Sequence, residues 1–146
     1  MKALRLSLAL IVMSAPVFAE PPATVTVKDS FDNVTFAVQN AITNAGLVVE
    51  AVSHTGDMLE RTKADVGSTK TIFLHAEVYS FCSAVVSRAV MEADPTNLQF
   101  CPYHIFVAER PEAPGQIIVG HEIYPHGTMD RVNALLDAIV KDATAN

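Results

Sequence analysis

An apolar run at the start of the chain is the first regular feature of its hydrophobic pattern. Two basic residues precede the largely apolar stretch 6–13, which is well short of the ~20 apolar residues that span a bilayer. Small residues around Ala19 and then two prolines follow it. This succession is typical of a cleavable secretory signal peptide. We therefore expect residues 1–19 to be removed, and the mature protein to be periplasmic or secreted without a membrane anchor.

Helical spacing of apolar residues marks four later segments. Ser30 is placed to cap a helix that ends before Gly46. A short helix is expected over 55–63. The apolar positions of 82–93 predict a third helix, although its adjacent β-branched valines would also suit a strand. The last helix is predicted to start at Thr128.

Shorter stretches predict β-strands, because their apolar and polar residues alternate or because nearly all their residues are apolar. They are 24–27, 47–53, 71–78, 103–109 and 116–124. The last two are separated by a loop with two prolines and a glycine, which is typical of a hairpin. The order βαβ(α)βαββα predicts a single α+β domain over residues 20–146, with helices packed on one mixed or antiparallel sheet.

The balance of charge narrows the range of partners. The chain has 10 basic and 16 acidic side chains. The signal segment contains two of the basic residues and no acidic one, so the mature chain would carry eight basic residues and a formal charge of −8. Nucleic acids and anionic membranes are bound through clusters of Lys and Arg. We expect neither as a partner.

The two cysteines, Cys82 and Cys101, are the most informative polar pair. In an exported protein such a pair is most often a disulfide. Cys82 lies on the apolar stripe of its predicted helix, and Cys101 lies just ahead of the strand expected beneath that helix. We therefore expect a structural disulfide. A redox-active pair, paired ligation of a metal or haem, and two free buried thiols are the alternatives.

Three histidines, His75, His104 and His121, lie on predicted strands. Imidazole is a common metal ligand, and His104 and His121 would project from the same side if the last two strands form a hairpin. No local ligand spacing supports such a site, and each histidine has an ordinary role as a hydrogen-bonded or surface residue. We expect no metal and no cofactor. Ligand binding by these histidines is a weaker hypothesis, with haem or a transition metal as the alternative.

Several short motifs occur in a fixed order along the chain. They are Ser30-Phe31-Asp32, the strand 71–78 with the helix after it, Ala93-Asp94-Pro95, and Phe100-Cys101-Pro102. In these motifs the chain resembles, over almost its whole mature length, the family called domain of unknown function 302 (DUF302). The surroundings of Cys82 and Cys101 resemble a two-cysteine branch of that family. The resemblance implies a compact α+β domain that forms a homodimer, with no assigned reaction and no catalytic residues.

Motifs of the common enzyme classes are missing from the sequence. It contains no nucleophile elbow, phosphate-binding loop, dinucleotide fingerprint or zinc-protease motif. The leading hypothesis is a non-catalytic accessory or binding module that uses its sheet face or a dimer interface to hold a small ligand or a periplasmic partner protein. The alternative is a periplasmic redox or haem/metal protein that uses Cys82 and Cys101, with His104 as a further ligand.

Overall fold

The computed structural model describes residues 20–145, so the predicted signal peptide lies outside the described residues. The elements are β1 (Ala23–Lys28), α1 (Phe31–Asn44), β2 (Val49–Ser53), α2 (Thr55–Thr62), β3 (His75–Phe81), α3 (Ala84–Ala93), the 3-10 helix η1 (Pro95–Phe100), β4 (Tyr103–Glu109), β5 (Gln116–His121) and α4 (Asp130–Ala143). This is the predicted order, with η1 added. The hydrophobic pattern did not indicate that short helix.

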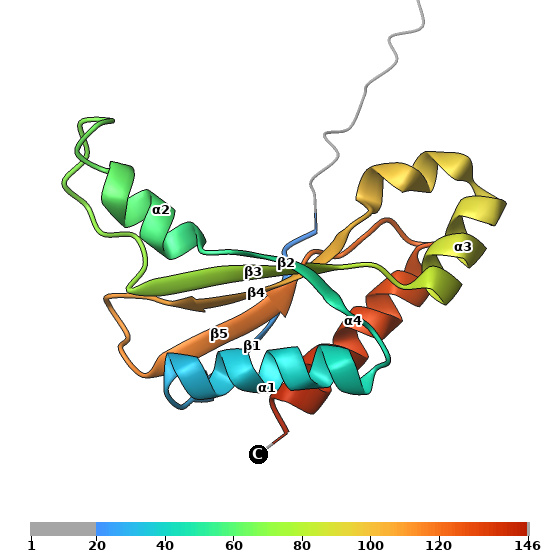
Figure 1. The fold of residues 1–146 in the computed structure, drawn as a ribbon, viewed down its shortest axis with the longest axis horizontal. Helices are drawn as coiled ribbons and strands as arrows, with labels where there is room; N and C mark the ends of the chain where they lie inside the picture. The colour runs from blue at the N-terminus through green and yellow to red at the C-terminus, as the bar shows by residue number, and fades with distance from the viewer. Residues whose placement is uncertain (1–19, 146) are drawn as a thin grey trace, which may run out of the picture.

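The five strands form one antiparallel sheet in the order β1-β5-β4-β3-β2. In Figure 1, α1 and α4 lie against one face of this sheet, α2 projects from the other side, and α3 and η1 stand at one end. The predicted α+β class is confirmed, and of the two predicted sheet types the antiparallel one is observed. Among residues 20–145, no helix is long and apolar enough to cross a membrane.

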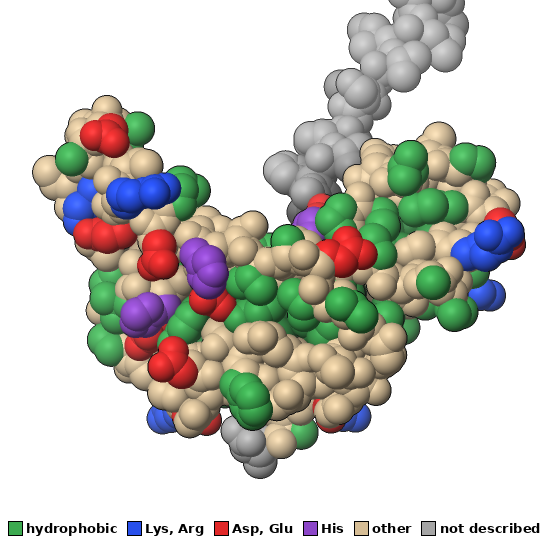
Figure 2. Space-filling view, in the orientation of Figure 1, with side chains coloured by type: hydrophobic (Ala, Val, Ile, Leu, Met, Phe, Trp, Pro, Cys, Tyr) green, Lys and Arg blue, Asp and Glu red, His purple; other side chains and the backbone are tan. Residues whose placement is uncertain are grey.

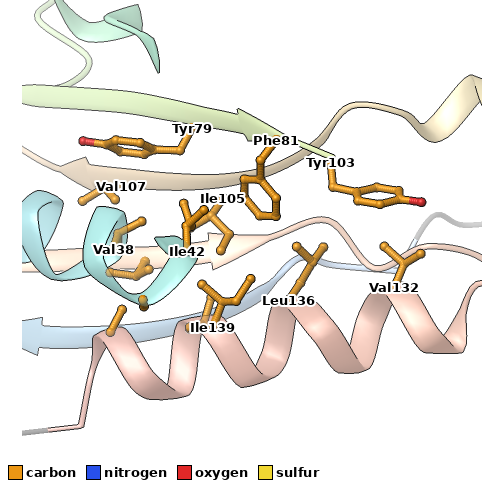
Figure 3. Close-up of a cluster of buried hydrophobic side chains, with 14 of the residues drawn as sticks. Val38, Ile42, Tyr79, Phe81, Tyr103, Ile105, Val107, Val132, Leu136 and Ile139 are labelled. Carbon is orange, nitrogen blue, oxygen red and sulfur yellow. The ribbon is translucent and has the colours of Figure 1, made fainter. Parts of the chain in front are cut away.

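Alternation of side chains along the strands gives the sheet two different faces. The inner face, which packs against α1 and α4, carries Tyr79, Phe81, Ile105, Val107, Ile117 and Val119. Figure 3 shows side chains of this face meeting apolar side chains of both helices. The other face, which we call the open face, carries Ala76, Val78, Ser80, His104, Phe106, Ala108, Ile118 and Gly120. The hydrophobic core therefore lies on one side of the sheet.

Helix α1 begins and ends where the sequence predicts. The Ser30 hydroxyl oxygen accepts a hydrogen bond from the backbone N–H of Asn33 at 3.2 Å, which satisfies one of the free donors at the helix start. Gly46, just beyond the helix end, has a φ of 77°. This left-handed conformation is strained for other residues, which explains a glycine at this place.

Strand β3 begins four residues later than predicted, at His75 rather than Thr71. The reason is a tertiary contact, because the Thr71 hydroxyl donates a hydrogen bond to Glu60 of α2 over 3.1 Å. This bond holds residue 71 beside α2. The chain reaches the sheet only at Leu74, whose N–H donates to the carbonyl oxygen of Glu109 at 2.9 Å. The prediction of a strand over 71–74 is therefore wrong.

Helix α3 begins at Ala84 rather than Cys82. Its N-cap is Ser83, whose hydroxyl oxygen accepts a hydrogen bond from the N–H of Val86 at 3.2 Å. The helical interpretation of this segment is confirmed over the strand alternative. The expectation that Cys82 lies on the apolar stripe of the helix is wrong, because Cys82 precedes the cap.

Strand β5 ends at His121, earlier than the predicted end at Tyr124. The Asn133 side chain of α4 accepts a hydrogen bond from the Tyr124 N–H and donates one to the Tyr124 carbonyl oxygen, both at 2.9 Å. Because the Asn133 side chain pairs with both backbone groups of Tyr124, these groups are not available to a neighbouring strand, and the chain leaves the sheet. Helix α4 then starts at Asp130, two residues after the predicted Thr128.

Candidate ligand-binding groove

The register of the sheet separates two of the histidines that the sequence suggested as ligands. Phe106 of β4 pairs with Gly120 of β5, and neighbours along a strand alternate between faces. His104 is therefore on the open face and His121 on the inner face. The expectation that they project from the same side is wrong, because it depended on a register that the sequence spacing does not determine.

His121 is a buried histidine that joins the sheet to a helix. Its exposed fraction is 1%. Its Nδ1 lies 2.8 Å from the carbonyl oxygen of Glu122, and its Nε2 lies 3.0 Å from the Asp137 carboxylate of α4. Both ring nitrogens are occupied by these oxygen atoms. This geometry gives His121 a structural role and leaves no ring nitrogen for a ligand.

His75 lies at the start of β3, apart from the other two histidines. Its ring packs on Phe31, with the ring centroids 5.0 Å apart, and its Nε2 is 4.0 Å from a carboxylate oxygen of Glu109. The three histidines are thus not brought together. Across residues 20–145, no three or more His, Cys, Asp or Glu side chains are grouped so that they could hold a metal ion.

Cys82 and Cys101 form a disulfide, as the sequence predicts. Their Cα atoms are 6.6 Å apart, within the usual range for such a bond. Cys82 directly follows β3, and Cys101 lies shortly before β4, where Phe81 and Tyr103 are paired. The bridge therefore ties the ends of two neighbouring strands across the α3–η1 excursion.

A polar group on the inner face was not anticipated from the sequence. The Glu77 carboxylate accepts a hydrogen bond from the Tyr79 hydroxyl and lies 2.9 Å from His54 Nδ1. Burial, and then the neighbouring Glu77 carboxylate, raise the pKa of Tyr79. Figure 2 shows histidine and acidic side chains gathered near the α2 end of the visible face. These bonds explain how a carboxylate is accommodated beside the core.

The main hollow of the open face is a groove of 430 Å³ at the hairpin end of the sheet. Its floor comes from Thr26 of β1 and Ile118 of β5, which are paired in the sheet. One wall is the segment 70–73 after α2, which contributes Ile72. The other is the loop 110–115 between β4 and β5, which contributes Arg110. Three parts of the chain that are far apart in sequence thus meet here.

Local hydrogen bonds fix both walls of the groove. The Glu109 carboxylate accepts a hydrogen bond from the N–H of Gly115 at 2.7 Å, across the hairpin loop. Gly115 has a φ of 75°, a conformation that glycine adopts without strain. On the other side, Thr71 is bonded to Glu60, and Leu74 to the Glu109 backbone. The groove is therefore a preformed feature of the fold, as ligand sites commonly are.

The groove combines a positive rim with apolar surface. Lys70 and Arg110 both line it, and within residues 20–145 neither has a carboxylate oxygen within 4.0 Å. Glu112 is the one acidic residue among the described lining residues, so the local balance is positive by one charge. Apolar side chains of Ile72, Phe73 and Ile118 complete the lining.

Comparison with known proteins places the chain in a family. The family described as "Domain of unknown function DUF302" matches residues 23–141. The chain belongs to the DUF302 family. A crystal structure of an uncharacterized conserved DUF302 protein from Bacillus stearothermophilus shares the fold, with a TM-score of 0.60 and 16% identity over 85% of this chain and 93% of that chain. No curated protein matches the chain.

DUF302 membership confirms the resemblance seen in the short motifs. The assignment to a two-cysteine exported branch of the DUF302 family stays a prediction. At 16% identity the solved structure supports the shared fold alone.

A smaller hollow of 190 Å³ lies at the other end of the open face of this DUF302 chain. Cys101, His104, Glu122 and Tyr124 are among the residues that line it. The Tyr124 hydroxyl is buried without a hydrogen-bond partner among the described residues. Burial is the main reason that the pKa of Tyr124 is raised to about 12. Of the predicted site residues, His104 and Cys101 are the two that share a hollow.

Sequence reasoning missed the larger groove in this DUF302 chain. Lys70 and Arg110 are 40 residues apart, and no motif in the sequence connects them. The sequence did carry one indication of the groove. Lys70 and Arg110 each lie within a few positions of apolar residues, and the chain has few other basic side chains. Proximity in space was needed to make that signal a site.

Proposed function

We propose that this DUF302 chain is an exported binding module that holds a small ligand in the groove on its open face. The observation that carries the proposal is the groove itself, with fixed walls, apolar surface and two basic side chains that have no carboxylate partner among residues 20–145. Clefts that combine apolar lining with a few polar groups are the usual form of small-molecule sites. The groove is the location that we propose for the binding role suggested by the sequence.

The chemistry of the lining favours binding over turnover. The described residues that line the groove include no cysteine, serine or histidine, and Thr26, which carries their one hydroxyl, has no histidine beside it in the lining to act as a base. Covalent catalysis by a hydroxyl or thiol depends on a nucleophile within hydrogen-bond reach of a base. The lining offers two cations, one carboxylate, the Thr26 hydroxyl, the Gln116 amide and apolar walls, which can hold and orient a ligand.

A tryptophan reporter tests ligand binding at this place. The chain contains no Trp, so Ile72→Trp would place the sole indole on the groove wall, at a side chain that is 47% exposed. Octanoate, which has a polar head and an apolar tail, is the probe. We expect saturable octanoate binding to shift the indole emission to shorter wavelength, because the bound tail removes water from the indole.

The matched control is Val85→Trp, which places the sole indole on an exposed position of α3. Its emission should not change over the same octanoate range. Equal responses from both reporters, or no response from Ile72→Trp, would contradict binding in the groove.

Export is the second part of the proposed function, and it is supported by the signal-like segment 1–19. Expressed in a Gram-negative host, the protein should be recovered from the periplasm with Glu20 as its first residue. Intact-mass measurement of the periplasmic fraction checks this result. A folded product in the cytoplasm that retains Met1 would contradict it.

A redox role is the second candidate function. Its support is that Cys101 of the disulfide and His104 line the same small hollow. An imidazole near a sulfur atom can assist proton transfer during thiol–disulfide exchange. The behaviour of the disulfide toward a mild thiol, described in the Discussion, separates this candidate from a structural bridge.

A further inference from the structure

We infer that the ligand of the groove is an amphipathic molecule with a single anionic head group. The inference rests on the proposed function, because it names the class of ligand for the same site. The head group lies between Lys70 and Arg110, and the apolar part lies on Ile72 and Ile118. The shared head-group chemistry is that of a carboxylate or a sulfonate.

The charge argument starts from the scarcity of basic residues in this chain. The whole sequence has a formal net charge of −6 and ten basic residues, of which two are in the predicted signal peptide. Among the other basic side chains of residues 20–145, Lys63 is paired with Glu60 and Arg88 with Glu92, and the rest, like Lys70 and Arg110, have no carboxylate oxygen within 4.0 Å. What sets Lys70 and Arg110 apart is that they lie together in one groove. A bound anion would be the negatively charged partner of these two side chains.

The net charge of the groove lining determines the charge that we infer for the head group. Lys70 and Arg110 contribute two positive charges to the lining, and Glu112 contributes one negative charge. A singly charged anion neutralises the surplus, and Arg110 can hold both oxygens of a carboxylate at once. A cationic head group would add to the positive surplus. The lining therefore discriminates by the sign of the charge.

The apolar part of the ligand follows from the remaining surface. Ile72 is about half exposed to solvent, and Ile118 and Phe73 are half-buried, although all three line the groove. Covering apolar surface is favourable, and a small inorganic anion covers none of it. A ligand that has only a head group leaves this part of the groove in contact with water. A chain or ring attached to the head group is thus part of the inferred ligand.

Binding of three probes by the Ile72→Trp reporter protein tests the inference. Octanoate has the inferred head and tail, octyltrimethylammonium has a similar tail with a positive head, and acetate has the head alone. We expect octanoate to bind at least about ten-fold more tightly than either other probe. The cationic probe loses the charge-assisted contact and acetate loses the apolar contact, and a loss of about 1.4 kcal/mol is a factor of ten.

Charge-removing variants identify the residues responsible. In the reporter protein, Lys70→Gln combined with Arg110→Gln should weaken octanoate binding about ten-fold. Arg131→Gln combined with Lys141→Gln removes the same charges from exposed positions on α4, on the other side of the sheet, and should leave the affinity within about two-fold. Far-ultraviolet circular dichroism verifies that both variants are folded.

The outcomes separate the two proposals. If octyltrimethylammonium binds the reporter as tightly as octanoate, or if both double variants weaken octanoate equally, the anionic head group is wrong and the groove remains a binding site. If acetate binds as tightly as octanoate, the apolar part is wrong. If no probe binds at Ile72→Trp, both the inference and the proposed function fail.

Discussion

Replacing both Cys82 and Cys101 by serine is expected to lower the free energy of unfolding by about 3 kcal/mol, from the closure entropy of a loop of about twenty residues. The bridge ties the ends of β3 and β4, so its loss gives the unfolded chain more freedom across the α3–η1 segment. For a domain of this size, the change corresponds to a fall of about 10 °C in Tm. Thermal and urea unfolding of the oxidised protein and the variant measure it.

The reduced wild-type protein is the control for the disulfide, because it lacks the bond and keeps both sulfur atoms. It should unfold near the midpoint of the serine variant. Equal midpoints for the oxidised protein and the variant would contradict a stabilising bridge. Reduction of the native protein by millimolar glutathione, with the fold retained, would favour the redox candidate over a purely structural bond.

Gly120→Ala is expected to destabilise the protein by about 3 kcal/mol, which is typical of overpacking between rigid groups. A Cβ atom at Gly120 would lie 2.5 Å from the backbone oxygen of Ala23 and 2.7 Å from the Phe106 ring. The Ala23 oxygen belongs to β1, the strand paired with β5, so that strand would have to shift. Urea unfolding of the purified variant measures the loss.

Gly46→Ala is the matched control, because it also adds a Cβ atom to a glycine. An added Cβ at Gly46 meets nothing within 4 Å, and its cost comes from the φ of 77° alone. We expect a loss of about 1 kcal/mol there. If Gly120→Ala lowers the free energy of unfolding no more than Gly46→Ala does, the result would contradict the close packing of β1 against β5 at Gly120.

Features set by neighbouring residues were predictable from the sequence. Ser30 caps α1 through a residue three positions away, and Gly46 ends it through its own backbone conformation. The amphipathic stripe of α1 is buried as its spacing predicts. Such local features depend on few residues, so the pattern of the chain is enough to find them.

Features set by distant residues were not predictable in the same way. Residues 71–74 have the composition of a strand, but the hydrogen bond from Thr71 to Glu60 keeps the start of this segment beside α2. The faces of His104 and His121 depend on the register between β4 and β5.

The candidate site depended still more on the fold. The disulfide was predicted because a pair of cysteines in an exported chain is most often a disulfide. The groove was not, because Lys70 and Arg110 become neighbours only when the segment after α2 returns to the sheet beside β4. Their charges were visible in the sequence, but their shared position was not.

The most direct test of ligand binding at the groove is a map of amide chemical shifts of the wild-type protein during titration with octanoate. We expect the largest concentration-dependent changes in residues 70–73 and 110–118, and small changes in α1 and α4 on the other side of the sheet. Saturation should give the affinity measured with the Ile72→Trp reporter. Changes confined to α1 and α4, or no saturable change at the groove, would contradict the account.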